Sequence, residues 1–170
     1  MEVLNSSVEL MCRDSPYTRY RRKQVDLLAR DTKKIDAKGR FFIPAKQKEA
    51  LGAELVVTNS LDAGYLCVYS KAQFEFVKQQ LAEIPSFNSD LRKVRRFIEG
   101  EALYVNVDSQ GRISVTSELW ERIGAKPGDE ICVFEYDGKL EICSKKTYDD
   151  TSYDLGNLNG LEAIWSVKGL

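Results

Sequence analysis

A short motif that occurs twice is the feature that most constrains how this chain can fold. Asp36-Ala37-Lys38-Gly39-Arg40 returns as Asp108-Ser109-Gln110-Gly111-Arg112, with 72 residues from Asp36 to Asp108. A β-branched residue precedes the Asp in both copies, Ile35 in the first and Val107 in the second. One small unit is therefore used twice, and such a repeat has to be identified before the rest of the fold is considered.

Each copy has the pattern of a strand, a turn, a strand, a short helix, and then two more strands joined by a turn. We place the first copy at residues 31–70 and the second at residues 103–148. Asp137-Gly138 lies between two strand-like runs of the second copy and is a strong signal for a β-hairpin. The pattern predicts a protein that is mainly β with helices, in the α+β class.

Residues 71–102, between the copies, are expected to form a helical hairpin. Each helix has apolar residues along one side: Phe74, Val77 and Leu81 in the first, and Leu91, Val94 and Ile98 in the second. Pro85 separates the two helices, and Ser89 suits the N-cap of the second one.

Charge is distributed unevenly along the chain. The formal net charge of −1 argues against a uniformly basic coat for nucleic acid, so local clusters decide the matter. Residues 1–30 are expected to be a flexible basic extension, and residues 149–170 an acidic tail. A second basic cluster, Arg92-Lys93-Val94-Arg95-Arg96, lies in the expected helical hairpin, where solvent exposure is its simplest explanation.

The cysteines and the absence of histidine argue against several kinds of site. The chain has no His, and its four Cys are scattered without a Cys-x-x-Cys pair, which argues against a zinc site or a Cys–His nucleophile. No phosphate-binding Gly loop is present either, so we expect no cofactor, no metal and no enzymatic activity. Cys67, Cys132 and Cys143 lie in apolar runs and are expected to be buried thiols of a cytosolic protein. We find no signal peptide and no apolar run of ~20 residues, and we therefore expect no contact with a membrane.

The motif itself is open to a purely structural explanation. Gly39 and Gly111 allow backbone angles that a side chain would oppose. Asp36 and Asp108 can accept hydrogen bonds from turn amides or pair with the following Arg. The simplest hypothesis is therefore a β-turn held by an Asp–Arg pair.

The sequence around the two motifs suggests a more specific hypothesis. The second motif is followed by a helix ending in Ile123-Gly124, then by Lys126-Pro127-Gly128-Asp129 and by Asp137-Gly138. This order resembles the SpoVT/AbrB-type swapped-hairpin DNA-binding domain. Two such copies separated by a helical hairpin resemble the MraZ family of bacterial transcriptional regulators, over roughly residues 31–148.

The resemblance implies two swapped-hairpin β repeats forming a double-AbrB-like barrel, assembled into a closed ring of identical subunits. It also implies binding to short direct repeats of double-stranded DNA upstream of the division and cell-wall gene cluster. The protein would then be a sequence-specific regulator, usually a repressor, in the cytoplasm and on the nucleoid. Members usually begin only a few residues before the first motif, so residues 1–30 are either a real basic arm or the product of a misplaced start codon.

The family's DNA-binding surface falls on the two motifs. We expect Arg40 to contact a base edge, Lys38 to contact phosphate, and Arg112 to share in either contact. Gln110 stands where the first copy has Lys38, so the second copy is expected to bind more weakly. Gly39 and Gly111 would shape the turns, and Asp36 and Asp108 would orient their arginines, since a carboxylate is repelled by phosphate.

Three departures from the family pattern leave an alternative open. Gln47 and Lys48 replace an aromatic residue and an Arg, Gln110 replaces a basic residue, and Thr116 replaces a proline. The alternative is a ring-forming assembly module on the same fold that does not bind DNA.

Overall fold

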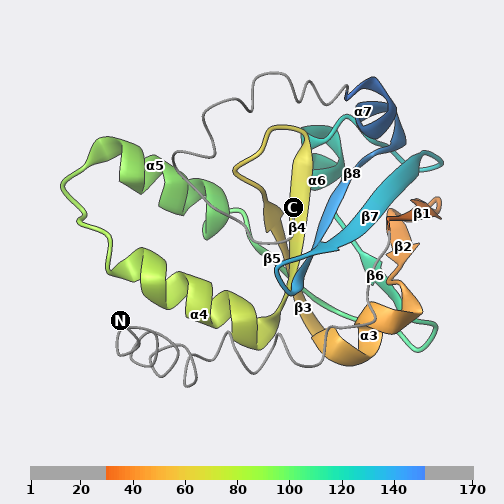
Figure 1. Ribbon diagram of the computed structural model, residues 1–170, viewed down its shortest axis with the longest axis horizontal. Helices are drawn as coiled ribbons and strands as arrows, with labels where there is room; N and C mark the ends of the chain where they lie inside the picture. The colour runs from red at the N-terminus through yellow and green to blue at the C-terminus, as the bar shows by residue number, and fades with distance from the viewer. Residues whose placement is uncertain (1–29, 152–170) are drawn as a thin grey trace, which may run out of the picture.

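The computed structural model describes residues 30–151, which form a mixed α/β protein with mostly antiparallel strands. Six strands make one sheet in the order β1-β7-β8-β4-β3-β5, and β2 and β6 make a separate two-stranded ribbon (Figure 1). The strands are β1 (Asp31–Lys34), β2 (Arg40–Phe42), β3 (Glu54–Asn59), β4 (Tyr65–Ser70), β5 (Leu103–Asn106), β6 (Arg112–Ser114), β7 (Glu130–Tyr136) and β8 (Lys139–Ser144). The helices are α3 (Ala45–Leu51), α4 (Lys71–Ala82), α5 (Ser89–Ile98), α6 (Ser117–Arg122) and α7 (Lys145–Asp150).

Strands of the two sequence copies are interleaved in this sheet. β1 precedes the first motif yet pairs with β7, which follows the second, and β5 precedes the second motif yet pairs with β3. β4 and β8 pair in the centre. A pseudo-two-fold axis between them relates β1, β7 and β8 in one half of the sheet to β5, β3 and β4 in the other half. In the ribbon, β2 of the first copy pairs with β6 of the second. The two copies are thus interlocked, and each completes the strand pairing of the other.

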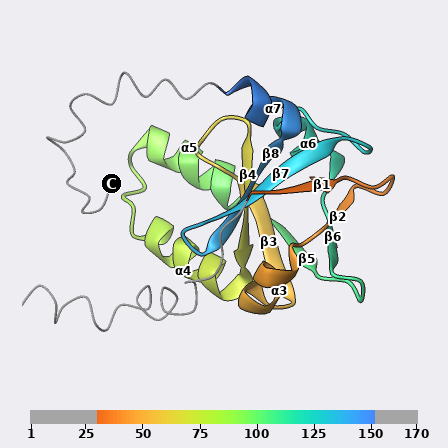
Figure 2. The same ribbon diagram turned by 45° about the vertical axis from the view of Figure 1, so that its right-hand side comes forward.

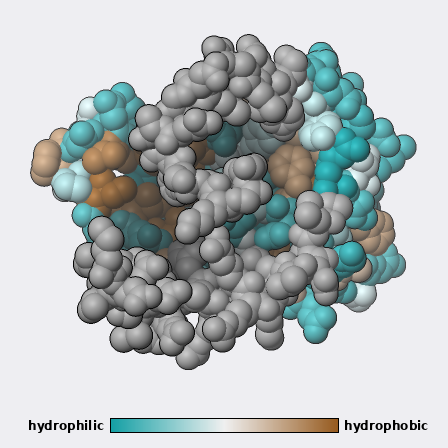
Figure 3. Space-filling view, viewed as in Figure 1, coloured by the Kyte–Doolittle hydropathy of each residue, from teal (hydrophilic) through white to brown (hydrophobic). Residues whose placement is uncertain are grey.

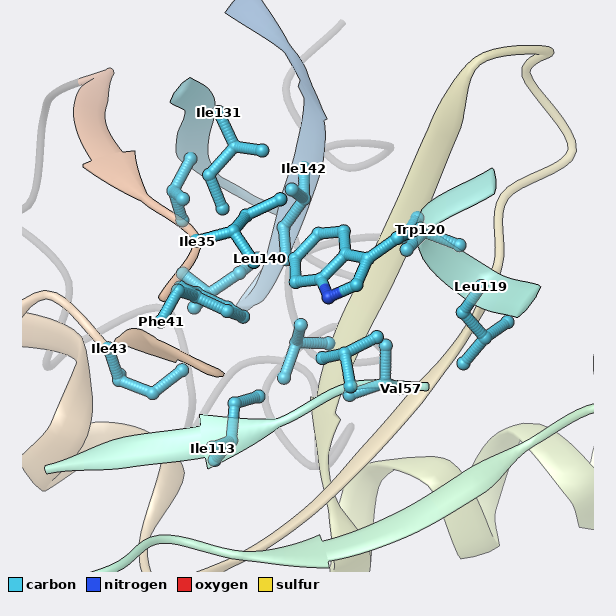
Figure 4. Packing of buried hydrophobic residues seen from close by; sticks show 14 of the residues in the cluster. Ile35, Phe41, Ile43, Val57, Ile113, Leu119, Trp120, Ile131, Leu140 and Ile142 are labelled. Carbon is cyan, nitrogen blue, oxygen red and sulfur yellow. The ribbon is translucent and has the colours of Figure 1, made fainter. Parts of the chain in front are cut away.

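A single main core joins the copies. Trp120 of α6 lies at its centre, with Phe41 of β2 edge-on at 5.7 Å between ring centroids (Figure 4). Around them pack aliphatic side chains from both copies, including Ile35, Ile113 and Ile131. Each such fully buried side chain stabilises the fold by about 1.5–3 kcal/mol relative to exposure. This core supports the ribbon from below, because Phe41 and Ile113 point inward from its two strands.

The expected helical hairpin is present and has a small core of its own. Phe74 of α4 and Ile98 of α5 are buried against Val56 of β3, as the apolar stripes predicted. Asn88 is the N-cap of α5, because its side chain accepts hydrogen bonds from the backbone N–H groups of Asp90 and Leu91. The prediction of Ser89 as the cap was wrong by one residue.

The hairpin and the ribbon lie at opposite ends of the molecule (Figures 1 and 2). Apolar surface is visible over the helical end in the space-filling view (Figure 3). The most exposed large apolar side chain of the described residues, Phe87, lies in the connection between α4 and α5. Between residues 30 and 151, no helix has the length and hydropathy needed to cross a membrane.

The cysteines within the described part of the chain behave as predicted. Cys67, Cys132 and Cys143 are free and buried. Burial raises the pKa of the Cys143 thiol to about 11, and it also raises the pKa of Cys67 and Cys132. The expected basic extension up to residue 29, and the acidic tail from residue 152, lie outside the described residues.

Candidate nucleic-acid interface

The first motif forms a tight turn that Asp36 closes. Its Oδ1 accepts hydrogen bonds from the backbone N–H groups of Lys38 and Arg40, both at 2.9 Å. Its Oδ2 accepts one from Nε of Arg40 at 2.7 Å and lies 2.7 Å from Nη2 of the same guanidinium. One carboxylate therefore sets both the backbone of the turn and the direction of the Arg40 side chain.

The second motif repeats this geometry. Oδ1 of Asp108 accepts from the backbone N–H groups of Gln110 and Arg112, both at 2.9 Å, and Oδ2 accepts from Nε of Arg112 at 2.8 Å. The Asp–Arg turn predicted from the motif is confirmed in both copies. Lys38 and Gln110 are exposed at equivalent places in the two turns.

Glycine is required in the first turn for two reasons. Gly39 has φ +75°, and a Cβ on it would lie 2.8 Å from the carbonyl oxygen of Val115. Its own carbonyl accepts hydrogen bonds from the backbone N–H of Val115 at 3.1 Å and from Nε1 of Trp120 at 3.0 Å. The turn of the first copy is thus fixed against residues of the second copy, and one of them is the central core residue.

The ribbon brings the two arginines to one face. Across the ribbon, Arg40 faces Ser114, Phe41 faces Ile113, and Phe42 faces Arg112. Since side chains alternate along a strand, the buried pair Phe41 and Ile113 places the other four side chains on the opposite, outer face. Arg40 and Arg112 therefore share the outer face of one two-stranded ribbon.

Lys48 is a site residue whose position the sequence did not reveal. It lies on α3 of the first copy, yet its Nζ would be 3.3 Å from a Cβ placed on Gly111 of the second turn. The repeat offset pairs Lys48 with Trp120, which contacts the first turn, so superposing the copies could have suggested this contact. The second turn thus has a neighbouring cation although Gln110 replaces a basic residue there.

Gln47, which departs from the family pattern, lies in the interior of the protein and not on the outer face of the ribbon. Gln47 is buried, and among the described residues its Oε1 has no hydrogen-bond partner. The equivalent position in the second copy is Leu119, which packs in the main core.

Both carboxylates of the motif remain ionised at neutral pH. The hydrogen bonds from the Arg40 side chain and backbone lower the pKa of Asp36 from 3.8 to about 2. The pKa of Asp108 is also lowered, first by the backbone N–H of Arg112 and then by its side chain. Around the ribbon and turns stand four cationic side chains, Lys38, Arg40, Lys48 and Arg112, against these two carboxylates. The local excess of positive charge contrasts with the net charge of −1 for the whole chain.

The basic cluster of α5 lies away from this interface (Figures 1 and 2). Lys93 pairs with Asp90 at 2.8 Å, Arg95 with Glu99 at 3.4 Å, and Arg92 donates to the backbone carbonyl of Ser86. Within residues 30–151, no cluster of three or more His, Cys, Asp or Glu has the arrangement of a metal site.

Curated relatives identify the family to which this chain belongs. A protein named Transcriptional regulator MraZ from Legionella pneumophila (strain Corby) is 34% identical over 119 residues, which are 68% of this chain and 77% of the relative. This chain belongs to the MraZ family. A second MraZ protein, from Lachnoclostridium phytofermentans, is 36% identical over 136 residues and matches 80% of this chain and 92% of its own length.

Two further comparisons accompany these relatives. The sequence model of the family described as "MraZ protein, putative antitoxin-like" matches residues 27–97, which include the first motif and most of the helical hairpin. Among solved structures, the solution structure of PHS018 from Pyrococcus horikoshii covers 71% of this chain and 91% of its own, at 15% identity and a TM-score of 0.28.

Proposed function

We propose that this MraZ protein is a sequence-specific DNA-binding transcriptional regulator that places the β2–β6 ribbon and its two turns against duplex DNA. The observation that supports this most directly is the outer face of the ribbon, where Arg40 and Arg112 lie together and are each held by an Asp. A two-stranded β-ribbon fits the major groove of B-DNA, where base edges can be distinguished. The relatives' name, Transcriptional regulator MraZ, points to the same class of function.

The geometry suggests a division of roles within the interface. An Arg held on one edge by a carboxylate keeps N–H donors for a bidentate contact with a guanine, which contributes about 1–3 kcal/mol of discrimination. We assign this contact to Arg40 and a base or phosphate contact to Arg112. Lys38, at the exposed tip of the first turn, suits phosphate, and Gln110 occupies the same place in the second turn. Asp36 and Asp108 act by orienting their arginines.

The assembly is part of the same proposal. We infer that the interlocked copies form the barrel of a double SpoVT/AbrB-type fold, since β1 contacts β2 and β5 contacts β6, which brings the ribbon against both edge strands of the sheet. Subunits would associate into a closed ring and present several ribbons to direct repeats upstream of the division and cell-wall genes. The expected role is repression in the cytoplasm, on the nucleoid, with no catalytic activity.

The test is the affinity of the full chain for the duplex upstream of its own gene, measured by fluorescence anisotropy against a scrambled duplex. Arg40→Ala should weaken specific binding by roughly 5- to 150-fold, the equivalent of about 1–3 kcal/mol. Arg40→Lys keeps the charge but loses the planar fork, so we expect it to bind both duplexes with little preference. Arg92→Ala, on the distant helix α5, is the matched control. It should change neither the affinity for the upstream duplex nor the affinity for the scrambled duplex.

Two results would contradict the proposal. If Arg40→Ala kept both the affinity and the sequence preference of the wild type, the ribbon would not be the interface. If the wild-type chain formed rings but bound none of this DNA, the alternative of an assembly module would be favoured.

A further inference from the structure

One residue of the ribbon's outer face is not explained by attraction to phosphate. Phe42 is 49% exposed, although it belongs to a strand whose neighbouring residue, Phe41, is fully buried. It lies directly across the ribbon from Arg112, whose guanidinium carbon is 5.8 Å from the centre of its ring. An exposed aromatic ring is thus held beside Arg112 on the face that we propose meets DNA.

The equivalent position in the second copy is not aromatic. The repeat offset pairs Phe42 with Ser114, which faces Arg40 across the ribbon. The backbone of the face is pseudo-symmetric, but one end therefore carries Arg112 with a ring and the other carries Arg40 with a hydroxyl. The two ends of this face therefore differ chemically.

We infer that Phe42 packs against the 5-methyl group of a thymine in the major groove and so fixes the direction in which the ribbon binds its DNA. This inference rests on the proposed function. Thymine is the base that offers an apolar group in the major groove, and a Phe side chain is suited to contact it. The charge on this face favours DNA over a protein surface, because Arg112 lies beside the ring, Arg40 shares the face, and Lys38 and Lys48 stand at the two turns. Ser114, which can bond to any base, leaves the other end less selective.

The experiment removes the methyl group without changing the hydrogen-bonding pattern of the base. The upstream duplex is prepared with thymidine or with deoxyuridine throughout, and the full chain is titrated with each. For each methyl group that Phe42 buries, the wild type should bind the deoxyuridine duplex about fourfold more weakly, the value expected for burying one methyl-sized apolar group. Phe42→Ser, which copies the residue of the second repeat, should bind the two duplexes equally.

Tyr104→Ser is the matched control. Tyr104 is also 49% exposed, but it lies on β5 of the six-stranded sheet and not on the ribbon. This variant should retain the wild-type difference in affinity between the thymidine duplex and the deoxyuridine duplex. Circular dichroism of each variant checks that it is folded.

Several outcomes would overturn the inference. Equal binding of the wild type to both duplexes excludes the methyl contact, and in that case a loss of binding in Arg40→Ala would show that the proposed DNA interface still stands. A Phe42→Ser variant that keeps the full deoxyuridine effect would mean that another group contacts the methyl. If Phe42→Ser changed the number of subunits in the assembly but left DNA binding unchanged, Phe42 would belong to a protein–protein interface. Failure of the wild type to bind either duplex would overturn both this inference and the proposed function.

Discussion

At the scale of single residues, the Asp–Arg pairs contribute orientation more than stability. The side chains of Asp36 and Arg40 are 34% and 25% exposed, and ion pairs in such contact with water add little to the free energy of unfolding. In the proposed complex, their effect would be to hold the guanidinium in one direction before DNA binds, which reduces the entropic cost of binding.

The pKa of Asp36 gives a direct measure of this pairing. Because Arg40 stabilises the charged carboxylate, we expect Asp36 to titrate at about 2 in the folded protein, below the ordinary value of 3.8. The folded-state pKa is lowered, so the contribution of the pair is complete above about 3.8 and is lost as the pH falls towards 2. Carboxyl NMR chemical shifts followed against pH provide the measurement.

Arg40→Ala supplies the comparison for that titration. It should move the pKa of Asp36 upward toward its ordinary range, while the pKa of Asp108 stays lowered because Arg112 is still present. An unchanged midpoint for Asp36 in this variant would show that the turn amides alone hold the carboxylate.

At the scale of elements, the short helix α3 of the first copy serves the turn of the second. Lys48 brings its ammonium group beside Gly111, where the motif lacks the lysine of the first copy. The two turns are therefore more alike in charge than their sequences indicate. We propose that the second turn also attracts phosphate, while the weaker binding of the second copy stays a prediction.

Lys48→Gln tests this contribution. Removing a phosphate contact should weaken binding to all DNA sequences to a similar degree and reduce the slope of log affinity against log salt by about 1 for each engaged subunit. Anisotropy titrations at several salt concentrations give the slope, with Lys93→Gln on α5 as the control. A slope that matches the wild type would place Lys48 outside the interface.

Local elements could be predicted from the sequence better than their partners could. The helical hairpin followed from the spacing of Phe74 and Ile98, and Asp137-Gly138 does form a hairpin turn, with φ of 51° and 76° at the two residues as a two-residue turn of this type requires. Strand periodicity, however, says which face is buried and not which strand lies alongside. The pairing of β1 with β7 could not be read from spacing, and neither could the pairing of β2 with β6 that brings both arginines onto one ribbon. The outward position of Phe42 was hidden for the same reason, because Phe41-Phe42-Ile43 is apolar throughout.

At the scale of the whole molecule, the two ends are suited to different contacts. The ribbon end carries Arg40 and Arg112, whereas the helical end has apolar surface and the exposed side chain of Phe87 (Figures 1 and 3). In a ring, weak binding by each ribbon would be multiplied, and linked sites of this kind can raise the effective affinity by ~10²–10⁴.

Binding should therefore depend steeply on the number of DNA repeats. Duplexes with one, two and four repeats at their natural spacing are compared at fixed salt, with sedimentation velocity to establish the subunit number. We expect the affinity to rise by more than tenfold from one repeat to several, since a second bound subunit acts at high local concentration. Inserting half a helical turn, about 5 bp, between repeats turns them to opposite sides of the duplex and should remove the gain. Equal affinity for one repeat and for four would contradict multivalent binding.

The interleaving of the two copies also determines the order in which the fold can form during translation. β1 leaves the ribosome roughly a hundred residues before its partner β7, which at about 5–20 residues per second is a delay on the order of 5–20 s. During that time β1 has no partner strand, and Ile35 and Phe41 lack the core neighbours that the second copy supplies, such as Ile131. The surface that displays both arginines therefore comes into being only when the second half of the chain has been translated.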